Sequence, residues 1–113
     1  MSNAEYQKRL QMSVPELFTE LGAELQGGHA AQPDKDEQEK LGQRYFERER
    51  PRIRERLCVS EVMKSLSSES DEVKMAAAIG DLLAPAFGML PIFTLSMLVT
   101  KIGINKLCPP ESK

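Results

Sequence analysis

The stretch Leu82–Thr100, LLAPAFGMLPIFTLSMLVT, decides the fold of this chain because its nineteen consecutive residues carry no charge. Its length alone is that of a membrane span, since about twenty apolar residues cross the hydrocarbon core of a bilayer. Pro85, Gly88 and Pro91 interrupt the stretch, and prolines and glycines in this density end or kink a helix. We therefore predict two short apolar helices joined at 85–91, not one long helix.

The residues on either side extend this pattern into an apolar segment over 73–107. Its first piece runs to about Ala84 and its second from Pro91 to Leu107. Ala76, Gly80 and Ala84 follow one another at four-residue steps, which places three small side chains on one face of a helix where a second helix can approach closely. We expect 73–107 to form a helical hairpin that is the core of the fold.

Upstream of the hairpin, residues 13–26 have the pattern of an amphipathic helix. Ser13 is a suitable N-cap, with Pro15 in the first turn and Glu16 at the positive end of the helix dipole. Five apolar residues then fall on one helical face: Val14, Leu17, Phe18, Leu21 and Leu25. Core packing is the expected role of this face, and presentation to a partner's groove is the alternative.

A second, highly charged helix is predicted from Lys35, with Asp34 as its cap. Pro51 either kinks this helix or starts a new one, because proline removes a backbone hydrogen bond and disfavours helical geometry at the preceding residue. An apolar face continues through it and beyond, carried by Leu41, Tyr45, Phe46, Ile53, Leu57, Val62 and Leu66. Serines at 65–70 end that run, and a further helix begins at Ser70–Glu72.

These patterns together predict an all-α fold, a compact single-domain bundle of five or six helices with the apolar C-terminal hairpin as its core. Alternating strand patterns are absent from the sequence, and 41% apolar with 28% charged residues is an ordinary globular composition. We expect residues 1–12 to form a short, weakly ordered helix or tail, 13–108 the helical domain, and 109–113 a disordered tail.

Insertion of the 73–107 hairpin into a membrane is the alternative to a buried core. Against it, each uninterrupted piece is too short to span a bilayer, and Asp81 would be costly in lipid. The amphipathic helices also need an apolar partner for their stripes, and the hairpin provides one.

Cys58 and Cys108, the only cysteines, lie fifty residues apart in no metal-binding spacing. We expect them to be inert, buried or half-buried thiols, with a Cys58–Cys108 disulfide as the alternative. The N-terminus lacks a basic region followed by an apolar run, so a cytoplasmic location is expected.

No residues in the sequence form a catalytic, metal or cofactor signature. His29, the only histidine, lies in the segment GGHAAQP with no partner at a recognisable spacing. Glycine-rich phosphate loops and nucleophilic serine motifs are missing. We therefore expect a protein that is not an enzyme and that needs no cofactor.

The charge pattern is more informative. Residues 13–43 carry seven acidic and two basic side chains, a net charge of −5, whereas 44–56 carry six arginines and three glutamates, a net charge of +3. Four of these arginines, Arg44, Arg48, Arg52 and Arg56, follow one another at four-residue steps and share a helical face if the helix survives Pro51. In one interpretation this face is solvated and laced with pairs such as Glu49–Arg52 and Arg52–Glu55.

The other interpretation makes these four arginines a docking surface for an acidic partner, since arginine forms bidentate contacts with carboxylates. We predict a small non-enzymatic protein–protein interaction module, such as an adaptor, an assembly factor or an inhibitor. Self-association is also possible because patches of opposite sign lie on one chain. A membrane-active protein acting through 73–107 is the first alternative. A nucleic-acid accessory protein is the second, disfavoured by the net charge of −2.

Overall fold

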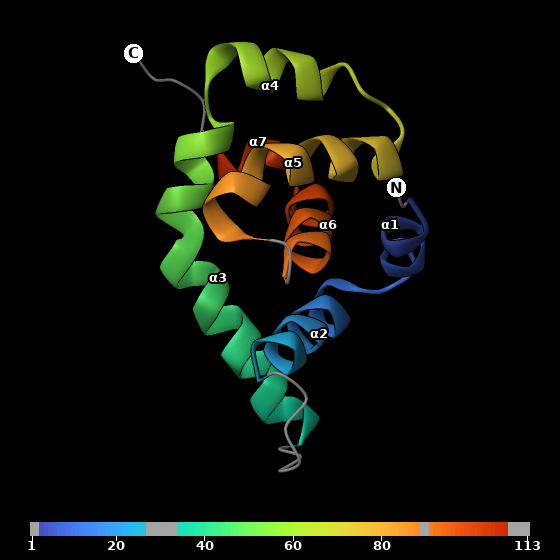
Figure 1. The fold of residues 1–113 in the computed structure, drawn as a ribbon, viewed down its shortest axis with the longest axis vertical. Coiled ribbons are helices and arrows are strands. Elements are labelled where there is room, and N and C mark those ends of the chain that lie inside the picture. The colour runs from blue at the N-terminus through green and yellow to red at the C-terminus, as the bar shows by residue number, and fades with distance from the viewer. Residues whose placement is uncertain (1–2, 27–33, 89–90, 109–113) are drawn as a thin grey trace.

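Helix α6, Ile92–Ile102, lies at the centre of the molecule (Figure 1). The computed structural model describes residues 3–26, 34–88 and 91–108 of the chain. A helix without charged residues on any face needs cover on all sides. Helix α6 carries no charge before Lys101, and eight of its residues are buried: Ile92, Thr94, Leu95, Ser96, Met97, Leu98, Val99 and Thr100. The most apolar part of the sequence is therefore the core, against which α1, α2, α5 and α7 pack.

Helix α5, Glu72–Phe87, packs against α6 and completes the predicted hairpin. Asp71 begins it, accepting hydrogen bonds from the backbone N–H groups of Val73 and Lys74 at 2.9 and 3.1 Å. The helix continues through Pro85, one turn beyond the expected end at Ala84, and stops at Gly88, whose φ is +81°. Pro85 has no N–H to donate to the Asp81 carbonyl, so the last turn of α5 forms with one backbone hydrogen bond fewer.

The second piece of the hairpin is two helices. Gly103, with φ at +106°, ends α6 and separates it from the single turn of α7, Ile104–Leu107. Glycine adopts this left-handed conformation without a steric penalty. With this extra turn the described residues form seven helices, where the sequence led us to expect five or six.

Helix α2, Val14–Gln26, begins with a reciprocal capping box. The Glu16 N–H donates to the Ser13 hydroxyl at 3.2 Å, and the Ser13 N–H donates to the Glu16 carboxylate at 2.8 Å. Leu17 and Leu21 are fully buried, with the rest of the predicted stripe packed against the core. Its expected role in core packing is confirmed.

Helix α3, Lys35–Leu57, forms the edge of the molecule beside α2 (Figure 1). Asp34 caps it as predicted, accepting from the Glu37 N–H at 2.9 Å. Two glycines allow α2 and α3 to cross closely: a Cβ at Gly22 would overlap the carbonyl oxygen of Gln38, and one at Gly42 would overlap that of Phe18. Neither glycine stood out in the sequence.

Pro51 lies inside α3, which continues as one helix to Leu57. Of the two alternatives considered for this proline, the start of a new helix is therefore excluded. The buried residues on either side of the proline, Phe46 and Ile53, hold both halves against the core. Helix α4, Ser60–Ser67, follows and buries Leu66.

Helix α1, Asn3–Leu10, packs onto α5 and α6. The sequence predicted a weakly ordered helix or tail over 1–12, but Tyr6 and Arg9 are only 7% and 5% exposed. The part of the chain that we set apart from 13–108 therefore contributes two side chains to the same core. Residues 109–113 lie outside the described part of the chain.

Cys58 and Cys108 form a disulfide, with their Cα atoms 5.4 Å apart. The expectation of two free thiols was wrong. Both residues end apolar runs, and packing of α3 and α7 on the same core brings the two ends together. The bridge closes a loop across 50 positions of the sequence.

The all-α prediction is confirmed, since no strand occurs among residues 3–26, 34–88 and 91–108. The Cα radius of gyration is 13.9 Å. Within the same residues no helix is both long and apolar enough to cross a bilayer.

Candidate functional site

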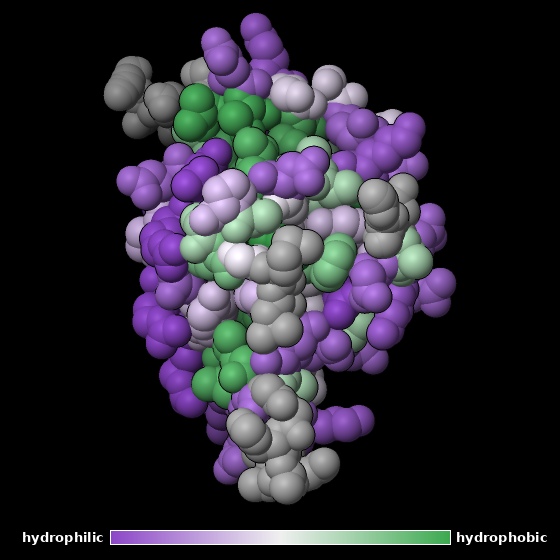
Figure 2. Space-filling model, in the orientation of Figure 1, coloured by the Kyte–Doolittle hydropathy of each residue, from purple (hydrophilic) through white to green (hydrophobic). Residues whose placement is uncertain are grey.

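The four arginines of the predicted docking surface all lie on α3, and all four are exposed. Successive residues of an α-helix are about 100° apart, so each four-residue step advances about 40° around the axis. Arg44, Arg48, Arg52 and Arg56 therefore wind partway around α3. Hydrophilic surface follows this edge of the molecule in Figure 2.

Arg52 is the member of the row that contacts another helix. Its Nη2 donates to the carbonyl oxygen of Ala86 at 2.7 Å, and its guanidinium lies 4.5 Å from the ring centre of Phe87, at the end of α5. Its Nη1 also donates to Glu49 at 2.7 Å. The predicted Glu49–Arg52 pair is thus present, while the predicted Arg52–Glu55 pair is not among the ion pairs of the described residues.

Arg44, Arg48 and Arg56 remain directed to solvent. Arg48 lies over the ring of Tyr45 at 5.3 Å and makes a long contact of 3.4 Å with Glu49. Arg44 and Arg56 form no ion pair with any residue that the structure describes. Their charges are therefore available to a ligand without first breaking an internal pair.

An open groove of about 700 Å³ lies beside Arg44 and Arg48 where α2 meets α3. Leu25, Leu41 and Tyr45 supply its apolar surface, and an apolar patch is visible in this region in Figure 2. Partial burial raises the pKa of the Tyr45 hydroxyl, with Glu49 adding to the effect. This groove combines an apolar floor with two arginines, the composition common at the centre of protein interfaces.

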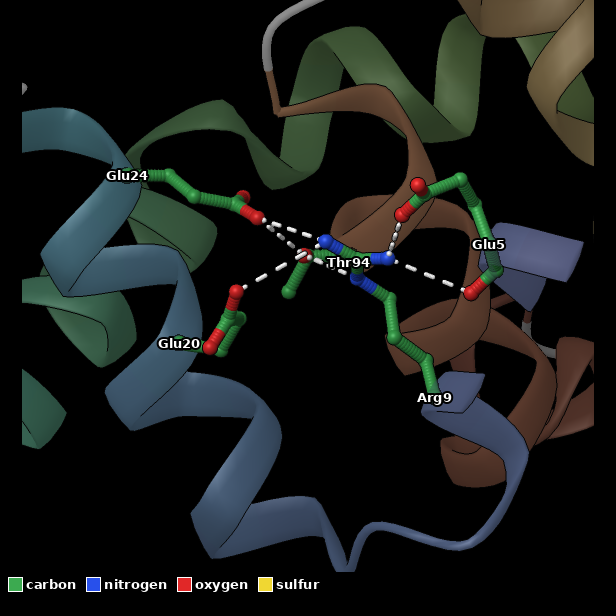
Figure 3. A network of polar contacts seen from close by, with 5 residues as sticks. All are labelled: Glu5, Arg9, Glu20, Glu24 and Thr94. Carbon is green, nitrogen blue, oxygen red and sulfur yellow. Dashed lines mark hydrogen bonds and ion pairs between the residues drawn. The ribbon is translucent and has the colours of Figure 1, made fainter. Parts of the chain in front are cut away.

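A second polar site, which the sequence did not reveal, is centred on Arg9 (Figure 3). The Nε of Arg9 donates to the Thr94 hydroxyl at 2.8 Å, its Nη1 to the Glu5 carboxylate at 2.6 Å, and its Nη2 to the Glu24 carboxylate at 2.9 Å. The Thr94 hydroxyl in turn donates to Glu24 at 2.9 Å. Glu20 lies 3.6 Å from Nη2. One guanidinium thus joins α1, α2 and α6.

The charges in this network do not balance, because one guanidinium faces three carboxylates. Burial raises the pKa of Glu24, and the negative charge of Glu20 adds to the effect, against the opposing hydrogen bonds from Thr94 and Arg9. The exposed carboxylate of Glu5 behaves in the opposite way, since its hydrogen bond from Arg9 lowers its pKa. Glu24 also keeps one oxygen, Oε1, buried with no hydrogen-bond partner among the described residues.

The sequence held few signals for this site. Arg9 was the one arginine outside 44–56, and its position near Tyr6 on a short polar helix did not indicate burial. Tyr6 itself packs edge-on to Phe93, with ring centres 5.1 Å apart. A Cβ at Gly80 would overlap the Tyr6 hydroxyl. Helix α1 therefore approaches the predicted ridge of small residues, Ala76, Gly80 and Ala84, at Gly80.

No group of three or more potential metal ligands occurs in the described parts of the chain. His29, the histidine considered above, lies outside those parts. Comparisons with protein-family models, curated proteins and solved structures find no match for this chain. The fold and these sites define a small all-α bundle with a basic outer helix and a buried guanidinium–carboxylate network.

Proposed function

We propose that this chain is a non-enzymatic interaction module that binds an acidic surface of a partner protein through the basic face of α3. The observation that carries the proposal is that Arg44 and Arg48 flank an open apolar groove on an unbroken helix, with Arg44 free of any ion pair to a described residue. Arginine beside apolar surface favours a partner with carboxylates next to an apolar side chain.

Within the predicted site, the arginines have different roles in this proposal. Arg44 and Arg48 are the contact residues, and Arg56 extends the basic surface toward the end of α3. Arg52 is partly occupied by α5, through the Ala86 carbonyl and the Phe87 ring. Its removal would therefore disturb the fold as well as the surface.

A protein partner is favoured over nucleic acid because glutamates lie among the arginines. Glu47 and Glu49 pair with Arg50 and Arg52 on the same helix, and the whole chain has a net charge of −2. Proteins that bind a phosphate backbone usually present a continuous positive surface.

The compartment is a separate prediction. The sequence predicted a cytoplasmic location and two free thiols. The structure has a Cys58–Cys108 disulfide instead, and disulfides are typical of oxidising compartments. Alkylation of free thiols in intact cells, before lysis, tests this point: two alkylated cysteines support the cytoplasm, and none supports an oxidising compartment.

The experiment that tests the proposed function is selection of displayed peptides against the wild-type chain. Selected peptides are expected to be rich in Asp and Glu with one large apolar residue. R44E/R48E should weaken their binding at least tenfold, and binding should also weaken between 50 and 500 mM salt, because screening reduces contacts between exposed charges.

The matched control is K64E/K74E, which changes the net charge by the same amount on exposed parts of α4 and α5. Its binding should stay within about twofold of wild type. Equal losses in both double variants would attribute binding to net charge alone and contradict the proposal. Preferred retention on RNA or DNA over the selected peptides would favour the nucleic-acid alternative.

A further inference from the structure

Two buried side chains one helical turn apart anchor helix α1 to the bundle, and the partly buried Leu10 also packs against the core. Tyr6 and Arg9 are its buried residues among those described, and both contact the start of α6. An isolated helix of eight residues is not stable in water. The helical state of α1 therefore depends on its contacts with the bundle, of which those of Tyr6 and Arg9 are the most buried.

The recess is formed by three other helices. Glu20 and Glu24 come from α2, Phe93 and Thr94 from α6, and Gly80 of α5 leaves room for the Tyr6 hydroxyl. Phe93 contacts both inserted groups: the Tyr6 ring packs on it edge-on, and the Arg9 guanidinium lies 5.8 Å from its ring centre. Without α1 the recess holds two carboxylates beside an aromatic ring, which suits an aromatic side chain followed by a guanidinium.

The fit of α1 to this recess is incomplete. Glu24 Oε1 is buried without a hydrogen-bond partner among the described residues, while the other carboxylate oxygen of Glu24 accepts from Arg9 and Thr94. Leaving a buried oxygen unpaired is unfavourable because its lost hydration is not replaced. A ligand that adds a donor to this oxygen would satisfy a group that α1 leaves unpaired.

We propose that this recess is a docking site for a helix of another protein that carries an aromatic residue and an arginine one turn apart, and that α1 is its intramolecular occupant. The partner displaces α1 by supplying the same two anchors together with a donor for Glu24 Oε1. The site is separate from the basic face of α3, so each can be tested without the other.

A partner is favoured over a second copy of the chain for an energetic reason. The α1 helix of a second copy would make the same contacts and leave the same Glu24 oxygen unpaired. It would also compete against an α1 that is tethered through residues 11–13 at an effective concentration on the order of millimolar. Exchange between copies therefore gains nothing, whereas a helix with additional donors does.

The test uses a fluorescent peptide of residues 2–13 and the full-length chain. The Y6A/R9M chain, whose own α1 lacks both anchors, should bind the peptide at least tenfold more tightly than wild type does. Peptides carrying Y6A or R9A should bind the Y6A/R9M chain at least tenfold more weakly. K8M, which removes an exposed charge from α1, is the matched control and should bind no better than wild type.

Hydrogen exchange on the wild-type chain is the second measurement, and it applies even where Y6A/R9M does not fold. Unlabelled peptide at about 5 mM, above the effective concentration of the tethered helix, should speed exchange at the α1 amides and leave those of α6 unchanged. Unchanged exchange in α1 would overturn the proposal, as would a folded Y6A/R9M chain that binds no peptide. A wild-type dimer that R9M abolishes would identify a second copy as the occupant and also overturn it.

Discussion

Arg9 and Thr94, separated by 85 positions in the sequence, are joined by a hydrogen bond of 2.8 Å from the guanidinium Nε to the threonine hydroxyl. The Thr94 hydroxyl in turn donates a hydrogen bond of 2.9 Å to the Glu24 carboxylate. Helices α1, α2 and α6 are thereby connected through one buried polar cluster. Removing one partner from a buried network of this kind is costly, because it leaves the remaining charge uncompensated.

Replacement of Arg9 by methionine should destabilise the protein by about 3 kcal/mol, because it removes the cation beside Glu24 and leaves that carboxylate with the Thr94 hydroxyl as its remaining donor. Chemical denaturation followed by circular dichroism measures the change in the free energy of unfolding. The control K8M, at an exposed position of the same helix, should stay within about 0.5 kcal/mol of wild type. An R9M chain as stable as K8M would show that the network contributes nothing to the fold.

The raised pKa of Glu24 predicts a pH dependence whose sign can be worked out. Its folded-state pKa lies above the ordinary value of 4.5, so the stability that Glu24 contributes is fully present below that value and is lost as pH rises through the raised pKa. The stability of wild type relative to E24Q should therefore fall as pH rises above 4.5. Carbon-13 NMR of the Glu24 side chain measures this pKa directly, and a value at or below 4.5 would contradict the prediction.

The close crossing of α2 and α3 predicts that Gly42→Ala is destabilising although alanine is the better helix former. The added methyl would overlap the Phe18 carbonyl oxygen, and overpacking costs about 1–3 kcal/mol. Thermal and chemical denaturation measure the loss. Q43A, at the next and exposed position of α3, should change the stability by less than about 0.5 kcal/mol; a G42A chain that is more stable than wild type would mean that the helices cross less closely.

The Cys58–Cys108 bridge closes a loop across 50 positions, for which the loop-entropy relation gives a stabilisation of about 4 kcal/mol. The C58S/C108S chain should lose stability of that order, and wild type with reducing agent should behave in the same way. Intact mass after alkylation tests the bridge itself. The oxidised protein should take up no alkyl group, and the reduced, unfolded protein should take up two.

The contacts of Arg52 with α5 predict that R52A and R56A differ in stability. R52A should cost about 1 kcal/mol, because it removes the bond to the Ala86 carbonyl and the packing on Phe87. R56A, exposed and without an ion pair to a described residue, should cost less than about 0.5 kcal/mol. Equal effects in denaturation would show that the four arginines form one uniform surface.

Much of the helical framework could be predicted from local patterns. The caps at Ser13 and Asp34 and the stripe of α2 act within one or two turns of the chain, so their residues are neighbours in sequence. The exposed arginines of α3 could be found for the same reason. The boundaries at Pro51 and Pro85 could not, because tertiary packing of the residues around each proline decided that the helix continues.

Local sequence patterns were enough to predict that the chain is helical and that its uncharged C-terminal segment forms the core, since periodicity and hydrophobicity are properties of each segment. Which distant groups meet could be learned from the folded structure alone. The burial of Arg9, the approach of Tyr6 to Gly80, the pairing of Cys58 with Cys108 and the separate role of Arg52 all depend on contacts between helices. Those contacts depend on how the surfaces of different helices fit against one another. The spacing of residues within one helix does not show that fit.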